Sequence, residues 1–387
     1  MGASGAPDAG AGAAWVGTWA CGPQLTETAN LPPAPGLSGN TLRQILYVSV
    51  GGSRLRVRLS NEFGDGPVTM NAVHLAVATT AGAIDTTTDQ ALTFAGSPSV
   101  TIPAGQLVFS DAFDFPLSPQ TSMAITIAFG TAPANVTGHP GSRTTSYLVA
   151  GGDAVAAASL PAPATTAHWY YITGIDVVGG SGASAAVVTL GDSITDGRGS
   201  TTDGNDRWPD DLSRLLRANA PTASVGVLNQ GIGGNAVLSG GLGPPAVQRF
   251  TRDVLNQTGA RWLVVFEGVN DIGGAADQTV ATNLIAAFGT FIDMAHAAGM
   301  RVYGVPITPF GGSMYDSADH QTARQTVNDW IRTSGRFDAV IDLDAAVADP
   351  ANPLNLLAAY DSGDHLHLTP AGYQKMADSI DLSLFMP

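Results

Sequence analysis

The stretch AAVVTLGDSITDG, residues 185–197, decides the fold of the second half of this 387-residue chain. Residues 185–190 form a continuous, mostly apolar run, which is typical of a strand buried on both faces of a parallel sheet. Gly191, Asp192 and Ser193 then favour a tight turn. An amphipathic run with leucines at helical spacing follows at 208–219. The stretch therefore predicts a strand, a turn and then a helix.

Apolar strands and amphipathic helices alternate through the rest of the chain. We predict further strands at 225–228, 262–266, 302–307 and 339–343, and further helices at 245–255, 279–298, 321–333 and 370–384. Such alternation indicates a parallel sheet with helices on both faces. We therefore expect residues 181–387 to form an α/β, flavodoxin-like domain with a five-stranded parallel sheet, and ligands to bind at the carboxyl ends of its strands.

Residues 15–180 show a different pattern, in which short alternating runs are separated by turn residues. The run 54–60 alternates arginine with aliphatic residues and follows two glycines, Gly51 and Gly52, which predicts a hairpin with the run 42–50. Many short strands without a long helical pattern predict an all-β accessory domain, a jelly-roll-like sandwich. The small residues at 179–184 mark the expected boundary between the two domains.

Composition and charge exclude several classes of protein. The chain carries 17 basic and 32 acidic residues, a formal net charge of −15, which argues against nucleic acids and anionic membranes as partners. A single cysteine, Cys21, rules out an intramolecular disulfide and a cysteine-based zinc site. No apolar run reaches the length of a transmembrane helix. Residues 1–14 lack the pattern of a signal peptide, and we expect a flexible leader there.

Polar residues follow the first predicted strand. Ser193 on a tight strand-to-helix turn would present its hydroxyl above the sheet, where a base can reach it. An ordinary Gly-Asp-Ser turn explains the same residues without any chemistry. The turn is not a G-x-S-x-G elbow, because Thr195 stands where that motif has its last glycine. We expect Asp192 to brace the turn through hydrogen bonds.

Two further loops follow the second and third strands. The segment NQGIGGNA, residues 229–236, contains G-x-G-x-x-A, which resembles a dinucleotide-binding fingerprint, although that fingerprint belongs after a domain's first strand. The alternatives are that its glycines free backbone N–H groups to face an anion, or that the segment is a plain turn. Asn270 and Asp271 follow the third strand. Asn270 could supply a side-chain amide donor there, or the two residues are simply a common loop pair.

Asp364 and His367 lie just before the last predicted helix. Their spacing allows the carboxylate to hold one imidazole nitrogen while the other nitrogen faces a site. A metal cluster that includes His365 is an alternative, as is a structural histidine. Because strand ends of a parallel sheet share one edge, the four polar sites together indicate a nucleophile, a backbone donor, an amide donor and a base with the residue that orients it.

These motifs make the chain resemble the SGNH or GDSL hydrolase superfamily, in its bacterial two-domain form with an N-terminal β-domain. The four characteristic positions of the superfamily fall on Ser193, Gly234, Asn270 and His367. The resemblance covers about residues 185–387 and extends more loosely to the first half. Two glycines precede Asn235, and the offset from the second strand selects Gly234 as the donor, with Gly233 next.

The resemblance implies acyl transfer from a carboxylic ester. Ser193 would be the nucleophile, His367 the general base and Asp364 the residue that orients the histidine. The backbone N–H groups of Ser193 and Gly234 and the amide of Asn270 would form the oxyanion hole. No metal and no organic cofactor is implied.

Three functions remain open at this point. The leading one is a serine esterase for short-chain, acetyl-type esters, exported from the cell of origin. The second is a polysaccharide acetylesterase whose β-domain holds the carbohydrate, with Trp15, Trp19, Trp169 and Tyr170 as a sugar-stacking face, although sandwich core is the alternative role for these aromatic residues. The third is a binding protein with a decayed site. The expected partner is a small ester or an acetylated carbohydrate.

Overall fold

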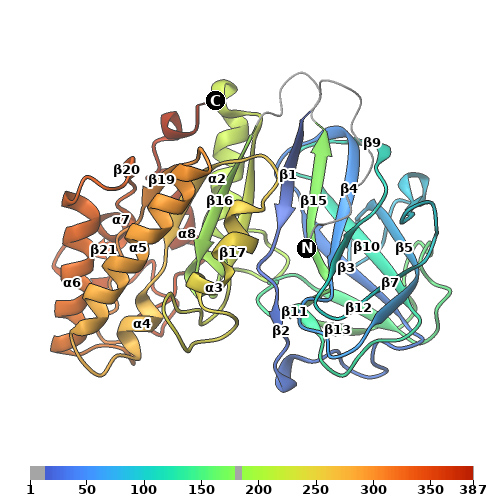
Figure 1. The fold of residues 1–387 in the computed structure, drawn as a ribbon, viewed down its shortest axis with the longest axis horizontal. Coiled ribbons are helices and arrows are strands. Elements are labelled where there is room, and N and C mark those ends of the chain that lie inside the picture. Colours follow the sequence, from blue (N-terminus) through green and yellow to red (C-terminus); the bar gives the residue numbers. More distant parts are fainter. Residues whose placement is uncertain (1–13, 179–184, 387) are drawn as a thin grey trace. The chain divides into compact units, whose positions relative to one another are not determined.

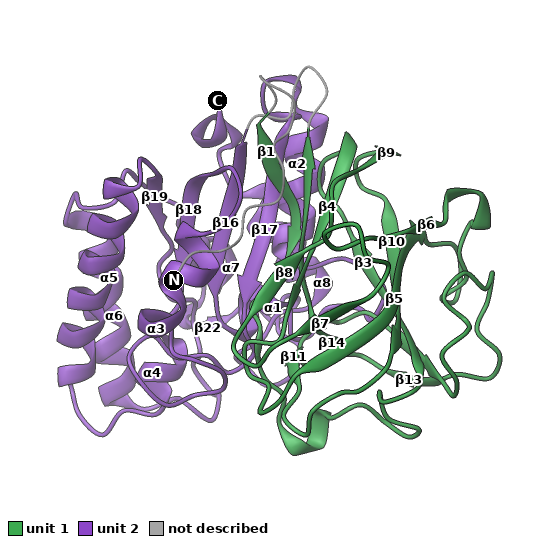
Figure 2. Ribbon diagram, turned by 45° about the vertical axis from the view of Figure 1, so that its right-hand side comes forward, with its two compact units in different colours: residues 1–183 green, residues 184–387 purple. Residues whose placement is uncertain are grey.

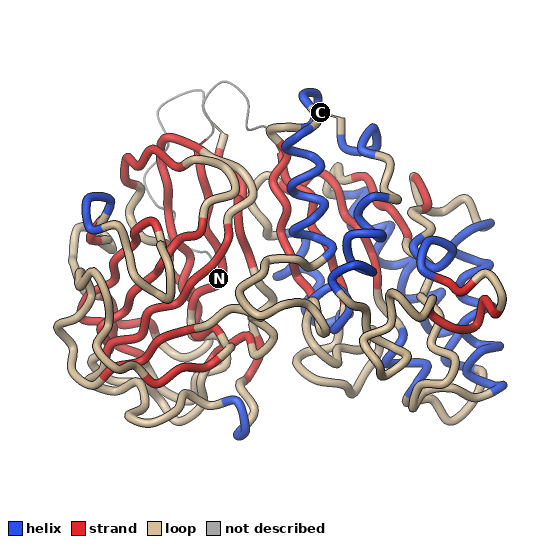
Figure 3. Tube along the Cα trace, turned by 180° about the vertical axis from the view of Figure 1, so that it is seen from behind, coloured by secondary structure: helices blue, strands red, loops and turns tan. Residues whose placement is uncertain are grey.

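The computed structural model describes residues 14–178 and 185–386, and it divides the chain into two compact units, residues 1–183 and 184–387 (Figure 2). The expected leader, apart from its last residue, and the expected boundary at 179–184 lie outside the described residues. The first unit consists mainly of strands, whereas helices and strands alternate in the second (Figure 3). Across the two described ranges, no helix combines the length and apolar character needed to cross a membrane.

The first unit contains three antiparallel sheets within residues 14–178 (Figure 1). The first sheet has the order β1 (Trp15–Ala20), β15 (Ile172–Val178), β4 (Gly52–Ser60) and β8 (Leu107–Phe109), and β9 (Phe113–Leu117) also pairs with β4. The second has the order β13 (Ala164–Thr166), β12 (Ser146–Val149), β3 (Thr41–Tyr47), β10 (Ser122–Phe129), β5 (Val68–Val77) and β6 (Gln90–Ala91), and β7 (Val100–Ile102) pairs with β5. The third has the order β14 (Trp169–Tyr170), β11 (Thr137–His139) and β2 (Gln24–Leu25). Short 3-10 turns, η1 (Thr28–Asn30) and η2 (Thr86–Thr88), lie in the connections.

The two larger sheets of this unit share one core. Leu55 and Val57 of β4 belong to the same cluster of buried side chains as Leu46 of β3 and Ile125 of β10. Apolar side chains from both sheets are removed from water in this cluster, which is the main source of stability for such a layer pair. The predicted β-rich first half is therefore confirmed.

The predicted hairpin across Gly51 and Gly52 is wrong, because β3 and β4 belong to different sheets. The segment between them bonds to both sheets: Val48 N donates to the main-chain oxygen of Thr121 (3.1 Å), and Ser49 N donates to that of Thr18 (3.0 Å). A side chain at Gly51 would place its Cβ 2.3 Å from a backbone oxygen, so the glycine serves a close crossing of chains. A glycine pair between two predicted strands fits either geometry.

The aromatic residues proposed as a sugar-stacking face belong mainly to the core. Trp19, Trp169 and Tyr170 are each at most 5% exposed. The rings of Trp19 and Trp169 pack edge to face with centroids 4.9 Å apart, an arrangement that favours burial together. Trp15 is half-buried, and the guanidinium of Arg56 lies 4.7 Å from the centre of its ring. The sugar-stacking interpretation is therefore wrong for three of the four residues.

The second unit contains a five-stranded parallel sheet, as predicted. Its order is β17 (Val225–Gly231), β16 (Ala185–Gly191), β18 (Ala260–Phe266), β19 (Arg301–Gly304) and β20 (Ala339–Val340). The first strand along the chain lies inside the sheet, and every residue of β16 is buried. A strand covered on both faces explains the unbroken apolar run that the sequence shows there.

Helices separate these strands along the chain, and α5 and α6 lie side by side (Figure 1). The helices are α1 (Ser193–Asp196), α2 (Trp208–Ala218), α3 (Ala246–Phe250), α4 (Val269–Gly273), α5 (Thr279–Ala297), α6 (Ala318–Thr333), α7 (Leu343–Val347) and α8 (Pro370–Asp378). A π-helical turn, η4 (Thr251–Leu255), continues α3, and 3-10 turns lie at η3 (Ala220–Thr222) and η5 (Leu382–Phe385). A two-stranded ribbon, β21 (Ala348–Asp349) with β22 (Asn352–Leu356), completes the unit.

Capping aspartates shorten two predicted elements near the end of the chain. The predicted strand 339–343 stops after two residues, because the Asp342 side chain accepts a hydrogen bond from Ala345 N and begins α7. The predicted helix 370–384 ends at Asp378, and the carboxylate of Asp381 accepts from Ser383 N to start a separate 3-10 turn. Neither change moves the loops that follow β16, β17 and β18.

Candidate active site

Ser193 lies where β16 ends and α1 begins. Asp192 caps the short helix, since its Oδ1 accepts a hydrogen bond from Ile194 N at 2.9 Å, which is the bracing expected for this residue. A Cβ added at Gly191 would lie 2.0 Å from Thr195 Oγ1, so only glycine allows the helix to start this close to the strand. The turn therefore fixes the Ser193 side chain at the carboxyl edge of the sheet.

His367 lies within hydrogen-bond distance of Ser193 and Asp364. Its Nε2 is 2.7 Å from Ser193 Oγ, and its Nδ1 is 2.7 Å from Asp364 Oδ2. Because a carboxylate only accepts, the Nδ1–H must donate to Asp364, which leaves the lone pair of Nε2 directed at the serine hydroxyl. Serine, histidine and aspartate thus form one continuous hydrogen-bonded series in the order that nucleophilic catalysis requires.

Hydrogen bonds within its own turn stabilise the charged form of Asp364. The main-chain N–H groups of His367 and Leu366 donate to Asp364 Oδ1 at 2.8 and 3.1 Å. Partial burial would raise the pKa of this carboxyl, but the hydrogen bonds from His367 outweigh it and lower the pKa to about 2. Asp364 is therefore an anion through the ordinary pH range, as a residue that supports an imidazolium should be.

His365 has a different partner from His367. Its Nδ1 lies 2.5 Å from Asp361 Oδ2, and its backbone has a positive φ of 60°. The two histidines are thus each paired with their own aspartate. Nowhere in the described parts of the chain do three or more histidine, cysteine, aspartate or glutamate side chains gather in a way that could hold a metal ion.

Gly234 lies in the loop after β17 with a φ of +71°, a conformation that glycine adopts without strain. Its carbonyl accepts from Leu242 N at 2.8 Å, and the Asn235 side chain holds the same loop through a bond to the Leu242 carbonyl at 2.7 Å. Within residues 14–178 and 185–386, the N–H groups of Ser193 and Gly234 have no acceptor. Both are therefore available to an incoming oxyanion.

The loop after β17 lacks the geometry of a dinucleotide site. In that motif the glycine-rich turn opens directly into a helix whose N-terminus meets the pyrophosphate. Here the next helix, α3, begins only at Ala246, beyond a further loop. The glycines instead bring the chain close to α1, because a Cβ at Gly231 would lie 2.3 Å from Asp196 N.

Asn270 lies on α4, a short helix that the sequence pattern did not predict. Its Nδ2 donates to the main-chain oxygen of Asn235 at 2.8 Å, and its Oδ1 accepts from the Tyr315 hydroxyl at 2.9 Å. The neighbouring Asp271 accepts from the N–H groups of Val237 and Leu238 at 2.8 and 2.9 Å. The loops after β17 and β18 are thereby joined, with Asn270 beside the loop that carries Gly234.

Arg249, which the sequence analysis did not single out, ties together three strand ends. Its guanidinium donates to the Gly191 carbonyl (3.0 Å), to the Gln230 carbonyl (2.7 Å) and to Glu267 Oε1 (3.1 Å). The side chain is fully buried and also pairs with Asp253 at 3.0 Å. In the sequence, Arg249 is recognisable only as an arginine four residues before Asp253 within a predicted helix. That spacing is typical of an ion pair on a helix surface and does not predict a buried arginine that joins strand ends.

Buried carboxyls crowd this edge of the sheet. Burial raises the pKa of Asp192 to about 7, and the charge of Asp271 adds to the rise. Burial also raises the pKa of Glu267 well above its usual range, with Asp192 contributing in the same direction. These groups hold protons to higher pH than free carboxylic acids, which limits the negative charge beneath a site where an oxyanion would form.

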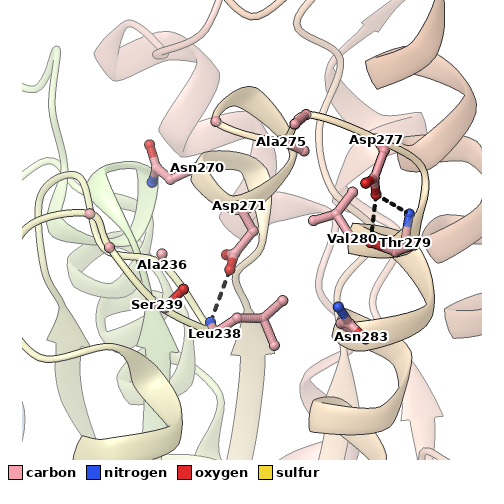
Figure 4. A pocket seen from close by; sticks show the side chains of 14 residues that line it. Ala236, Leu238, Ser239, Asn270, Asp271, Ala275, Asp277, Thr279, Val280 and Asn283 are labelled. Carbon is pink, nitrogen blue, oxygen red and sulfur yellow. Dashed lines mark hydrogen bonds between the residues drawn. The ribbon is translucent and has the colours of Figure 1, made fainter.

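A cavity of about 420 Å³ lies beside Asn270, between the loop after β17 and the start of α5 (Figure 4). Leu238 and Val280 give it apolar surface, and Ser239 and Asn283 give it hydrogen-bonding side chains. Figure 4 shows that Asn270 and Asp271 leave α4 in different directions, the latter toward Leu238 N. The cavity can hold a small group of mixed polarity.

Residues 189–375 match the model of the GDSL-like Lipase/Acylhydrolase family. No curated protein matches the chain. A GDSL-like lipase from Bacteroides thetaiotaomicron is 19% identical, with 52% of this chain and 88% of that chain covered and a TM-score of 0.39. An acetylxylan esterase from Geobacillus stearothermophilus is 20% identical, with 51% and 93% covered and a TM-score of 0.40.

Proposed function

We propose that the second unit is a serine esterase that hydrolyses short-chain, acetyl-type carboxylic esters through an acyl-enzyme on Ser193. The observation that carries this proposal is the series of two 2.7 Å contacts from Ser193 Oγ to His367 Nε2 and from His367 Nδ1 to Asp364 Oδ2. The match of residues 189–375 to the acylhydrolase family model supports the class of reaction. The identity of the ester is part of the proposal.

The reaction begins when Ser193 Oγ attacks the ester carbonyl carbon. His367 Nε2 takes the hydroxyl proton as the C–O bond forms, and Asp364 stabilises the resulting imidazolium. The carbonyl oxygen becomes an oxyanion, which accepts hydrogen bonds from the N–H groups of Ser193 and Gly234 and from the amide of Asn270. The tetrahedral intermediate then expels the alcohol, which takes the proton from His367, and leaves an acyl group on Ser193.

Water repeats the sequence on the acyl-enzyme. His367 removes a proton from the water as it attacks the acyl carbonyl, and the same donors meet the second oxyanion. Collapse of this intermediate returns the proton to Ser193 Oγ and releases the carboxylic acid. All proton transfers pass through one imidazole, which requires it to be neutral at the start of each half-reaction.

An aryl phosphonate ester that reacts with activated serines tests the proposal. Incubation should add one phosphonyl group to the peptide that contains Ser193 and abolish hydrolysis of p-nitrophenyl acetate in parallel. Ser193→Ala is the control, and it should neither be labelled nor hydrolyse the ester. A wild-type protein that is folded but neither labelled nor active would instead indicate a binding protein with a decayed site.

A second candidate is an acetylesterase for carbohydrates, and the mixed polarity of the cavity beside Asn270 favours it. Ser239 and Asn283 can exchange hydrogen bonds with sugar hydroxyls, whereas a pocket for an alkyl chain needs mainly apolar walls. Comparing acetate release from acetylated xylan with hydrolysis of p-nitrophenyl acetate and p-nitrophenyl butyrate separates the two candidates. A higher kcat/KM on the xylan would favour the carbohydrate ester.

A further inference from the structure

The amide of Asn270 is engaged on two sides. Its Nδ2 donates to the main-chain oxygen of Asn235 at 2.8 Å, while its Oδ1 accepts from the hydroxyl of Tyr315 at 2.9 Å. A primary amide carries two N–H groups. The second one has no acceptor among the residues that the structure describes, so a single N–H of Asn270 is left for a substrate.

These two contacts define which way the amide faces. If the group turned over, Oδ1 would face the Asn235 carbonyl, and two acceptors would meet at hydrogen-bond distance. The hydroxyl of Tyr315 stabilises the observed orientation from the other side, because it supplies the proton that Oδ1 accepts. The free N–H therefore points in one direction only.

Tyr315 is itself held in place at both ends. Its ring packs against Gly273 of α4, where an added Cβ would lie 2.3 Å from the Tyr315 Cγ. Its main-chain oxygen accepts a hydrogen bond from His320 Nδ1 at 2.7 Å, and His320 belongs to α6. A glycine on α4 and a histidine on α6 thus place the hydroxyl against Asn270.

The hydroxyl of Tyr315 also stays protonated. Burial raises the pKa of this phenol above its usual range, and the charge of Asp192 acts in the same direction. A phenol that keeps its proton remains a donor to Oδ1 through the neutral and mildly alkaline range. The orientation of the amide is therefore stable where an esterase with a neutral imidazole would work.

We propose that Tyr315 is a positioning residue that fixes and polarises the Asn270 amide for oxyanion stabilisation. A hydrogen bond donated to Oδ1 draws electron density from the amide nitrogen, so the remaining N–H becomes a stronger donor. The benefit is larger for an oxyanion than for a neutral carbonyl, since charged acceptors bind donors more strongly. This inference rests on the proposed function and adds a residue to its machinery.

A double-mutant cycle on p-nitrophenyl acetate hydrolysis tests the inference. Tyr315→Phe keeps the ring against Gly273 and removes only the hydroxyl. We expect it to lower kcat about three- to tenfold, the range that one hydrogen bond supplies, and to leave KM within about twofold. Because Tyr315 acts through Asn270, the double variant with Asn270→Ala should have the same kcat as Asn270→Ala alone.

Tyr303→Phe is the matched control. The hydroxyl of Tyr303 donates to the main-chain oxygen of Leu384 rather than to a proposed site residue, and its loss should leave kcat unchanged. An unchanged kcat in Tyr315→Phe overturns the inference, as does a double variant in which the two losses multiply, because a merely structural tyrosine would act independently of Asn270.

The variants at Ser193 and Asn270 distinguish a failure of the proposed function from a failure of the role proposed for Tyr315. If Ser193→Ala keeps wild-type turnover, both the proposed function and the role of Tyr315 are wrong. If Ser193→Ala is inactive and Asn270→Ala is impaired while Tyr315→Phe matches the wild type, only the role of Tyr315 is wrong.

Discussion

Arg249 lies with its guanidinium 3.1 Å from the carboxylate of Glu267, and neither side chain is exposed to solvent. The same guanidinium donates to the carbonyl of Gly191, two residues before Ser193. The positive charge of Arg249 is stable in the protein interior only because several hydrogen-bonding and charged partners surround it. The pair therefore couples the stability of the second unit to the position of the proposed nucleophile.

Arg249→Met should strongly destabilise the protein. The change leaves Asp253 and Glu267 buried without the guanidinium, and removing one partner of a buried pair costs about 3–5 kcal/mol in the free energy of unfolding. Urea denaturation of both proteins measures the loss. The surface residue Arg217 provides a control, since Arg217→Met should change stability by no more than about 0.5 kcal/mol. Equal effects of the two substitutions would contradict the role assigned to Arg249.

Asp192→Asn should change how stability depends on pH. The pKa of Asp192 is raised to about 7 in the folded protein, chiefly by burial, against about 4 in an unfolded chain. The folded state thus keeps a proton that the unfolded state has lost, so this group's contribution is complete below about pH 4 and is lost as the pH rises toward 7. Asparagine does not titrate, and its oxygen can still accept from Ile194 N.

We therefore expect Asp192→Asn to gain stability relative to the wild type between about pH 5 and about pH 8. Urea midpoints of the two proteins at both pH values give the difference directly. Asp378→Asn, a change at the surface, should show no such trend. A wild-type-to-variant difference that stays constant over this interval would be at odds with a buried, protonated Asp192.

His367→Ala and His365→Ala form a matched pair for the base. The two histidines lie two residues apart and each contacts an aspartate, but only His367 reaches Ser193. Loss of His367 should lower kcat by at least about 10³, whereas loss of His365 should have a mild effect. Steady-state turnover of p-nitrophenyl acetate measures both. Comparable losses that added zinc restores would point to a metal site instead.

The proposed nucleophile and base could be predicted because local sequence determines where they lie. Ser193 follows a buried strand directly, and Asp364 and His367 share one turn, so spacing alone brings the last two together. The strands of a parallel sheet then carry their carboxyl ends to the same edge. The five-stranded sheet was predictable for the same reason, since buried strands and amphipathic helices leave different periodicities in the sequence.

Arg249 and Tyr315 could not be found in this way, because their contacts join residues that are distant in the chain. Arg249 meets Gly191 across 58 positions, and Tyr315 meets Asn270 across 45. The error at Gly51 has a similar origin. Whether a glycine pair turns a strand back or carries it to another sheet depends on partners such as Thr18 and Thr121, which no local pattern reveals.

Asn270→Ala separates a catalytic amide from a structural one. The amide should bind the tetrahedral oxyanion more strongly than the ground-state carbonyl, so its loss should lower kcat by about 10²–10³ and leave KM almost unchanged. The substitution also removes the bonds to Asn235 and Tyr315, which should cost about 1–2 kcal/mol of stability. Turnover and melting temperature are measured on the same preparation, so that kcat can be corrected for the folded fraction.

Asn219→Ala is the matched control for that measurement. Its amide donates to Thr222 Oγ1 at 3.1 Å at the end of α2, so the variant loses a comparable hydrogen bond without touching the loops of the site. We expect it to lose about 1 kcal/mol of stability with an unchanged kcat. If Asn270→Ala behaved in the same way, the amide would act only as a link between the loops after β17 and β18. The oxyanion would then rely on the N–H groups of Ser193 and Gly234.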